Sequence, residues 1–183
     1  MLVNVRIKGQ MFPYDLSGPY EFKTGKKRGT AAEKLMFLNR SYLVWLKNVL
    51  DAGMKIGSKP NKMHLHLGWI LNAGEFVKAS HICNYCFAEP DKKNIQFFSV
   101  RHSHGLCTYG ERFTCCDGDS CKFRLLEEKS HLLPLKFSSL SYFRNGEEGR
   151  IGKFFKEIFL GREQLDPDEA FQLFLSANTA SQL

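Results

Sequence analysis

Cysteines in the middle of the chain have the residue type and spacing of a zinc site. Cys83 and Cys86 form a pair with two residues between them, and further thiols follow near residue 115. Such a spacer lets both thiolates occupy one edge of a tetrahedron, the geometry that zinc adopts in structural sites. The ligands that this spacing predicts are Cys83, Cys86, Cys115 and Cys121. Four thiolates close the coordination shell, so hydrolytic zinc chemistry is not expected.

The third ligand has an alternative. Cys115 and Cys116 are adjacent in the chain, and we favour Cys115 while Cys116 could serve in its place. Further candidate ligands nearby are Cys107, His81, His102 and His104. The N-terminus lacks the features of a secretory signal, so we expect a cytoplasmic protein in which cysteines bind metal instead of forming disulfides.

Around these ligands the sequence predicts a strand hairpin and a helix. Residues 94–100 and 111–114 would form the hairpin, with its turn at Gly105. Residues 121–129 are good helix formers, and a helix that begins at Cys121 stabilises that thiolate through the partial positive charge of the helix N-terminus. A cysteine knuckle, a hairpin and a helix that carries the last ligand together describe a treble-clef zinc finger.

The order of these motifs also resembles a known family. In residues 109–115 a glycine, an acidic residue and an aromatic residue precede Cys115, and five residues then lead to Cys121. With the cysteine pair and Gly105, residues 81–128 resemble the C-terminal treble-clef finger of elongation-factor-G-binding proteins, which include fusidic-acid resistance factors. The resemblance implies a zinc finger that binds a translation factor or the ribosome. The helical N-terminal part of that family is not recognisable in this chain.

The positive charge of the chain is concentrated in its N-terminal third. Residues 1–62 contain 12 Lys and Arg against 4 Asp and Glu, whereas residues 63–183 contain 14 against 15. A glycine-flanked run of cations at residues 23–29 precedes a predicted helix start, where N–H groups and positive charge favour phosphate binding. The candidate nucleic-acid contacts are Lys23, Lys26, Lys27, Arg28 and Arg40. The alternative is that the excess charge serves solubility alone.

The basic run continues into an aromatic helix. Residues 22–30 read FKTGKKRGT, and residues 41–46 read SYLVWL. A glycine–lysine turn followed by a tyrosine–leucine–x–tryptophan–leucine helix resembles, over residues 20–50, the small C-terminal module of exodeoxyribonuclease X and of phage-type proteins. The resemblance implies contact with nucleic acid. We expect Tyr42 and Trp45 to belong to the core of this module, the alternative being platforms on which bases stack.

The remaining pattern predicts an α+β chain. We expect a half-buried strand at residues 3–7, a helix that starts at a Thr30–Glu33 capping box, and a second helix from Ser41 to about Gly53. The parts that we expect are a basic module at 1–56, a treble-clef zinc-finger domain at 63–133 and a helical tail at 134–183.

Apolar spacing also predicts the elements outside the finger and the basic run. Residues 64–69 look extended, which would place His64 and His66 on one exposed strand face. The tail should contain helices at residues 151–160 and 167–177, because apolar side chains recur there at helical spacing.

Two arrangements could support catalysis, and neither is complete. HNH nucleases use a treble-clef scaffold, and His102 and His104 lie near the hairpin, but the following helix lacks the required Asn and second His. A Cys107 or Cys116 nucleophile beside one of these histidines is the other arrangement. We therefore expect a protein without enzymatic activity.

The function that the sequence predicts is binding of DNA, RNA or a ribonucleoprotein by a zinc-finger protein related to phage or mobile elements. The first alternative is a translation-factor or ribosome-binding protein, and the second is a nuclease or a viral inhibitor of a host protein. Apolar stretches such as residues 42–46 and 65–71 are too short to span a membrane, so no membrane partner is expected.

Overall fold

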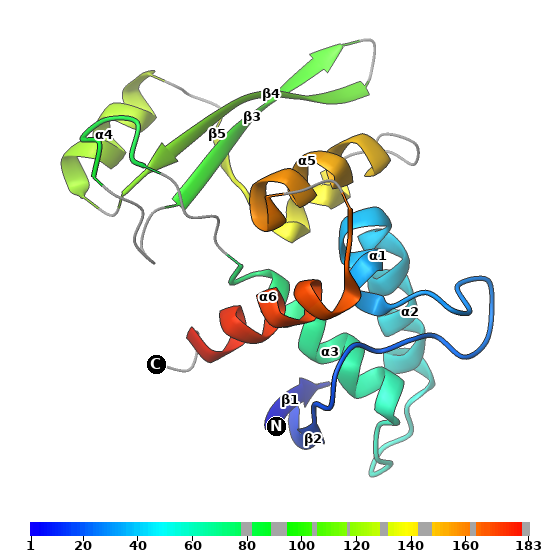
Figure 1. The fold of residues 1–183 in the computed structure, drawn as a ribbon. Coiled ribbons are helices and arrows are strands. Elements are labelled where there is room, and N and C mark those ends of the chain that lie inside the picture. Colours follow the sequence, from blue (N-terminus) through cyan, green and yellow to red (C-terminus); the bar gives the residue numbers. More distant parts are fainter. Residues whose placement is uncertain are drawn as a thin grey trace.

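The structure, a computed structural model, contains both helices and strands and confirms the α+β class. It describes residues 1–77, 82–88, 95–103, 106–116, 118–128, 132–142, 148–161 and 164–180. The elements in chain order are β1 (Leu2–Ile7), β2 (Gln10–Asp15), α1 (Ala32–Leu38), α2 (Arg40–Gly53), α3 (Lys62–Gly74), β3 (Ile95–Ser103), β4 (Leu106–Cys115), α4 (Asp119–Glu128), β5 (Leu132–Pro134), the 3-10 helix η1 (Phe137–Tyr142), α5 (Glu148–Leu160) and α6 (Pro167–Ala180) (Figure 1). Among the described helices, none has the length and apolar character needed to cross a membrane.

The first two strands form an antiparallel hairpin. Val3, Val5 and Ile7 are buried and the residues between them are exposed, which confirms the predicted half-buried strand. The connection is a two-residue turn in which Lys8 and Gly9 have φ angles of 47° and 83°. Two positive φ angles in succession match the right-handed twist of the strands on either side.

The segment that contains His64 and His66 is a helix, so the predicted extended strand is wrong. The Asn61 side chain caps α3 by accepting a hydrogen bond of 2.9 Å from the His64 N–H. The residues of α3 between His64 and Gly74 are then buried on most sides of the helix. An apolar–polar alternation of only four residues could not separate a strand from a buried helix, because a helix that is buried all round has no polar face to reveal its period.

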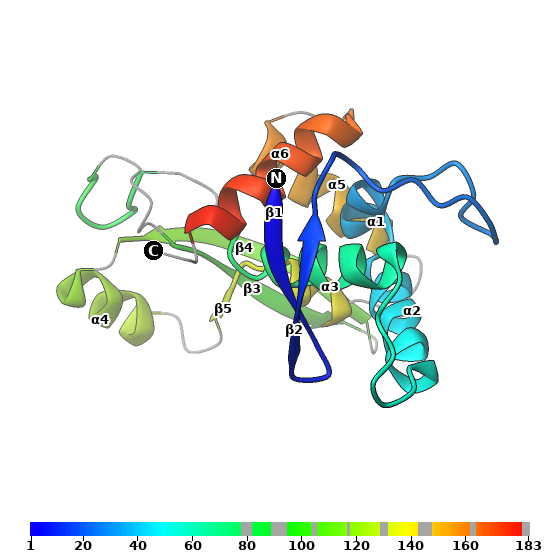
Figure 2. The ribbon, with the colours of Figure 1, turned by 90° about the horizontal axis from the view of Figure 1, so that it is seen from below.

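One large apolar core joins the N-terminal elements to the C-terminal tail. Phe137 of η1 lies 4.8 Å from the Phe37 ring of α1 and 5.1 Å from the Phe174 ring of α6, measured between ring centroids. The same core includes α3, and Figure 2 shows α3 next to the β1–β2 hairpin. The core therefore continues across the loop at residues 54–61, where the sequence analysis placed a boundary.

The two predicted tail helices are present. Gly161 has a φ angle of 69° and ends α5, and the Asp166 carboxylate accepts a 2.9 Å hydrogen bond from the Asp168 N–H at the start of α6. Gly152 allows α5 to approach α1 closely, because a Cβ at that position would collide with the backbone carbonyl of Phe37. The tail is thus packed on the core through a contact that needs glycine.

The second sheet has the strand order β4-β3-β5. The predicted hairpin is confirmed as β3 and β4, which are longer than expected, while its Gly105 turn lies outside the described residues. The predicted helix is confirmed as α4. Along β3, Phe97 packs into a small cluster with the cysteines, whereas the next residue, Phe98, is buried in the large core. The sheet therefore lies between the two cores.

Candidate functional site

Four cysteine sulfurs from three parts of the chain gather into one group that could hold a metal ion. The sulfurs of Cys83, Cys86, Cys116 and Cys121 all lie within 4.8 Å of one another. The Sγ atoms of Cys86 and Cys116 are 3.7 Å apart, far beyond the length of a disulfide bond of about 2 Å. Cys83 and Cys121 are buried, Cys116 is half-buried and Cys86 is exposed, so the group lies at the edge of the small core.

The knuckle, which lies between α3 and β3 in the chain, directs backbone N–H groups at the Cys83 sulfur. The chain turns back on itself at Phe87, whose φ angle is 58° and whose N–H donates to the Cys83 carbonyl at 3.1 Å. Burial opposes ionisation of the Cys83 thiol, but hydrogen bonds from the N–H groups of Cys86, Tyr85 and Cys116 together lower its pKa to about 6. This sulfur is therefore prepared to act as a thiolate ligand.

Cys121 reaches the group from the first turn of α4. Burial, followed by hydrogen bonds with the sulfurs of Cys116, Cys86 and Cys83, raises the pKa of its thiol to about 12. The charge of the nearby Cys83 also contributes to the raised pKa of Cys121, since negative charges this close repel one another. A cation among the four sulfurs would remove that repulsion, which is the chemistry that such a donor set provides.

The structure places the sulfur of Cys116, and not that of Cys115 as expected from the sequence, in the group. Cys115 is buried in the small core with Phe113 and Leu125, and its Sγ donates to the Cys116 carbonyl at 3.2 Å. Burial, and then the nearby charge of Cys83, raises the pKa of Cys115 to about 11. Side chains two apart on a strand share a face, so Phe113 and Cys115 both point into the core. Cys116 is the first residue after the strand, and its side chain points towards the other cysteines. The period of this strand was a signal that could have identified Cys116.

Two of the other candidate ligands lie in the part of the chain that the structure describes, and neither belongs to the sulfur group. His81 and His104 lie outside the described residues. His102 and Cys107 are paired across β3 and β4 at one end of the hairpin, whereas Cys115 is paired at the other end. Eight residues of strand separate Cys107 from Cys115, a distance of roughly 25 Å, so Cys107 cannot share a metal ion with the sulfur group.

The basic run forms a closed loop between β2 and α1. The Phe22 N–H donates to the Thr30 carbonyl at 3.1 Å, and the Gly29 N–H donates to the Phe22 carbonyl at 2.8 Å. Gly25 and Gly29 have φ angles of 79° and 77°, so both use the conformational freedom of glycine. The loop projects from the body of the molecule beside α1 and α2 (Figures 1 and 2). Of the predicted contacts in it, Lys23, Lys26 and Arg28 are exposed and Lys27 is half-buried.

A buried hydrogen-bond network holds the base of this loop, and the sequence analysis missed it. Glu33 does not close a capping box: α1 begins at Ala32, and its N-cap residue makes no side-chain hydrogen bond. The Glu33 carboxylate instead accepts the Tyr20 N–H at 3.1 Å and lies 2.7 Å from Nε2 of His66. The other ring nitrogen of His66 lies 3.0 Å from the Tyr14 hydroxyl. Residues 33 positions apart make this contact, so no local sequence signal could have found it.

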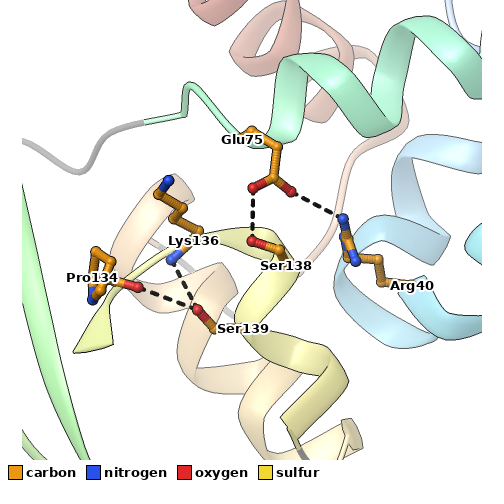
Figure 3. A network of polar contacts seen from close by, with 6 residues as sticks. All are labelled: Arg40, Glu75, Pro134, Lys136, Ser138 and Ser139. Atoms are coloured by element: carbon orange, nitrogen blue, oxygen red, sulfur yellow. Dashed lines mark hydrogen bonds and ion pairs between the residues drawn. The ribbon is translucent and has the colours of Figure 1, made fainter. Parts of the chain in front are cut away.

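Arg40, the fifth predicted nucleic-acid contact, belongs to an internal network. Its guanidinium lies 3.0 Å from one carboxylate oxygen of Glu75, and the Ser138 hydroxyl donates to the other oxygen at 2.7 Å (Figure 3). Only 11% of the Arg40 side chain is exposed. Next to it, the Ser139 hydroxyl links Lys136 N–H to the Pro134 carbonyl. Arg40 therefore connects α2 to α3 and η1, and its charge is already paired.

The aromatic helix α2 turns a different face outward than the sequence analysis expected. Asn39, and not Ser41, caps it by accepting the Tyr42 N–H at 3.1 Å. Leu43 is the residue that is fully buried, whereas 57% of Trp45 is exposed, so the prediction of a core role for Trp45 is wrong. Tyr42 is half-buried, and the Lys27 ammonium lies 5.8 Å from the centre of its ring.

Comparisons with known proteins leave the family of this chain open. No protein-family model matches it, and the searches of curated proteins and of solved structures also give no match. The functional assignment therefore rests on the sulfur group and on the basic loop with its neighbouring helix.

Proposed function

We propose that this chain is a non-enzymatic zinc-finger protein that binds nucleic acid through the basic loop at residues 22–30. The observation that carries the proposal is the exposure of Lys23, Lys26 and Arg28 on a loop whose backbone is held closed by hydrogen bonds. Cations on an ordered, projecting loop bind phosphates without a large cost in conformational entropy.

Two acidic side chains of the N-terminal region are engaged in internal contacts, which leaves the surface of this region more positive. Glu33 is buried beside His66, and Asp51 lies 2.6 Å from both Lys47 and His64. Half of the four acids in residues 1–62 therefore contribute little to the surface charge. A local excess of positive surface attracts polyanions, of which nucleic acid is the most common.

Zinc is the metal that fits the sulfur group best. Four thiolates at the usual Zn–S distance lie about 3.8 Å from one another at the corners of a tetrahedron, close to the 3.7 Å between Cys86 and Cys116. All-sulfur donor sets select zinc over the harder cations that prefer oxygen ligands. Cys83, Cys86, Cys116 and Cys121 would hold the ion, and its part would be to stabilise the fold of the finger.

A protein partner is the second candidate, because the finger exposes apolar side chains. The exposed members of this finger surface are Ile82, Phe87, Phe123 and Leu126. A translation factor or the ribosome, as in the elongation-factor-G-binding family that the finger resembles, would be such a partner. Under this alternative the basic loop would contact RNA of the same particle.

A salt titration tests the main proposal. Labelled single-stranded DNA, duplex DNA and RNA would be bound to the wild type and to the Lys26→Gln, Arg28→Gln variant at several salt concentrations. Each phosphate contact contributes roughly 0.7 to 0.9 to the slope of log K against log salt, so this variant should lower the slope by about 1.5. Zinc content is measured for each protein first.

The matched control is the Arg112→Gln, Lys136→Gln variant, which removes two exposed cations that lie outside the basic N-terminal region. The proposal predicts that this control retains the wild-type affinity and slope. Equal losses in the two variants would show that binding depends on total charge and not on the loop. Absence of salt-dependent binding by the wild type would overturn the proposal and favour a protein partner.

A further inference from the structure

The outer face of α2 carries apolar side chains that the core does not cover. Trp45 is 57% exposed and Val49, one turn later, is 48% exposed. Ile56, in the loop that follows the helix, is fully exposed. Positions 45 and 49 lie on one face of a helix, so these two side chains form a continuous stripe.

The indole of Trp45 is connected to the basic loop through Tyr42. The two rings lie 5.7 Å apart between centroids, with 35° between their planes. The Lys27 ammonium lies over the Tyr42 ring at 5.8 Å from its centroid, and Phe22 packs edge-on against Tyr42 at 6.2 Å between ring centroids. Contacts through Tyr42 thus hold the exposed indole beside the cations of the basic loop.

Cations lie at both ends of the stripe. The basic loop supplies Lys23, Lys26 and Arg28 at the N-terminal end of α2, and Lys55 and Lys59 are exposed in the loop beyond its C-terminal end. About 12 Å of helix rise separates Trp45 from the end of α2 at Gly53, and the second group lies in the loop beyond. An apolar stripe between two groups of positive charge is complementary to a chain that carries both flat apolar rings and regularly spaced negative charge.

We infer that α2 binds a single strand of DNA or RNA, with a base stacked on Trp45 and phosphates at the flanking cations. The inference rests on the proposed function and specifies its ligand. A base in a duplex has both faces covered by its neighbours, whereas a base in a single strand offers a face to an exposed aromatic side chain. Single strands should therefore bind more tightly than a duplex of the same length.

The first test is the affinity of a Trp45→Ala variant for a short labelled strand of DNA, the same strand of RNA, and the matched duplex. Stacking of one base changes affinity by about 5-fold to 150-fold, so the variant should bind both single strands at least about fivefold more weakly, with little effect on the duplex. Its salt slope should equal that of the wild type, because stacking releases no counterions. The control is Phe123→Ala, which removes an aromatic side chain of similar exposure from the finger.

Tryptophan fluorescence supplies a second readout. The chain has two tryptophans, and Trp69 is only 3% exposed, so an added strand should quench the emission of Trp45 alone. A Trp45→Phe variant should lose the quenching and keep much of the affinity, since phenylalanine retains a stacking face. This variant also guards against a loss of binding that is caused by misfolding.

The outcomes separate the two proposals. Salt-dependent binding in which Trp45→Ala equals the wild type, or in which duplex and single strand bind equally, would overturn the stacking inference and leave the basic loop as the contact. A wild type that binds no nucleic acid would overturn the proposed function itself. A loss of affinity in Phe123→Ala equal to that in Trp45→Ala would also contradict the inference, because the finger would then be the site.

Discussion

The two cores of this protein differ in what holds them together. The large core contains many fully buried side chains, among them Phe37, Phe137 and Phe174, and closes around the Glu33–His66 pair. Among the residues that the structure describes, the small core of the finger has Leu125 and three cysteines as its buried members, with a few half-buried aromatic side chains around them. A cluster of this size removes too little apolar surface from water to offset the conformational entropy of folding. The contrast predicts that the finger depends on a metal ion bound by the four sulfurs and that the large core does not.

The surfaces of the two regions differ as well. The N-terminal region presents cations around Trp45, whereas the finger presents apolar side chains such as Phe87 and Phe123. The sulfur group therefore lies on the less basic part of the molecule. In the proposed function the ion stabilises one half of the protein, and the other half makes the phosphate contacts.

Removal of the metal should have the largest effect and would show most directly that the cores differ. A structural zinc site contributes on the order of 10 kcal/mol to folding, so a chelator should unfold the finger. The large core should remain folded because its apolar contacts do not involve the sulfurs. Hydrogen exchange should show loss of protection in α4 and β4 while α1 and α3 stay protected. Unchanged protection in α4 would contradict the dependence on metal.

Substitutions at two adjacent cysteines test which of them binds the metal ion. Cys116→Ala should abolish stoichiometric zinc binding, because it removes one of the four grouped sulfurs. Cys115→Ala should keep about one zinc per chain and lose only some packing in the small core. Zinc is measured by mass spectrometry after dialysis, and the opposite result would return Cys115 to the ligand set.

Glu33→Ala should produce the next largest effect, and in the large core alone. Removing this acceptor should cost about 3 kcal/mol, because His66 and the Tyr20 N–H would lose their hydrogen-bond partner. Urea denaturation at pH 7 measures the loss. Glu21→Ala is the control, since that side chain is exposed and its loss should change stability by less than about 0.5 kcal/mol. A similar loss in both variants would show that the buried carboxylate has no special role.

The smallest effect should come from Tyr14, through the dependence of stability on pH. Burial, and then the charge of Glu33, raises the pKa of Tyr14 to about 12 from 10.0. A raised pKa means that the folded state favours the neutral phenol. The corresponding stability is complete below pH 10 and is lost as the pH rises towards 12. A difference of two pKa units corresponds to about 2.7 kcal/mol.

The Tyr14→Phe variant isolates this contribution. At pH 7 it should be about 1 kcal/mol less stable than the wild type, because the hydrogen bond to His66 is lost. Between pH 10 and 12 the difference should shrink and reverse, since phenylalanine has no proton to lose. A difference that stays constant over this range would show that Tyr14 titrates normally in the folded protein.

Much of the finger could be predicted from the sequence because its signals are local. The cysteine pair predicts a knuckle, the long gap between Cys86 and Cys115 with Gly105 in it predicts a hairpin, and the composition of residues 121–129 predicts α4. The choice between Cys115 and Cys116 depended on the side on which each residue leaves the strand. The period of the strand indicates that side, but the prediction of Cys115 was based on the spacing of the ligands.

The N-terminal region was less predictable because its decisive contacts are distant in the chain. His64 and His66 look like alternating strand residues until α3 is surrounded by β1, β2 and α6, which makes a buried helix more favourable. Glu33 has the spacing of a capping residue, yet a buried histidine offers it a stronger partner than the helix N-terminus.

By itself the sequence determined the α+β class, the first strand, the hairpin and helix of the finger, the two tail helices and the position of the basic loop. Each of these follows from periodicity, turn residues or spacing within a few positions of the chain. Only the tertiary structure decided that Cys116 joins the sulfur group, that Arg40 is paired with Glu75 and that Trp45 faces solvent. The physical reason is that burial and pairing are properties of what packs against a residue, and those neighbours come from other parts of the chain.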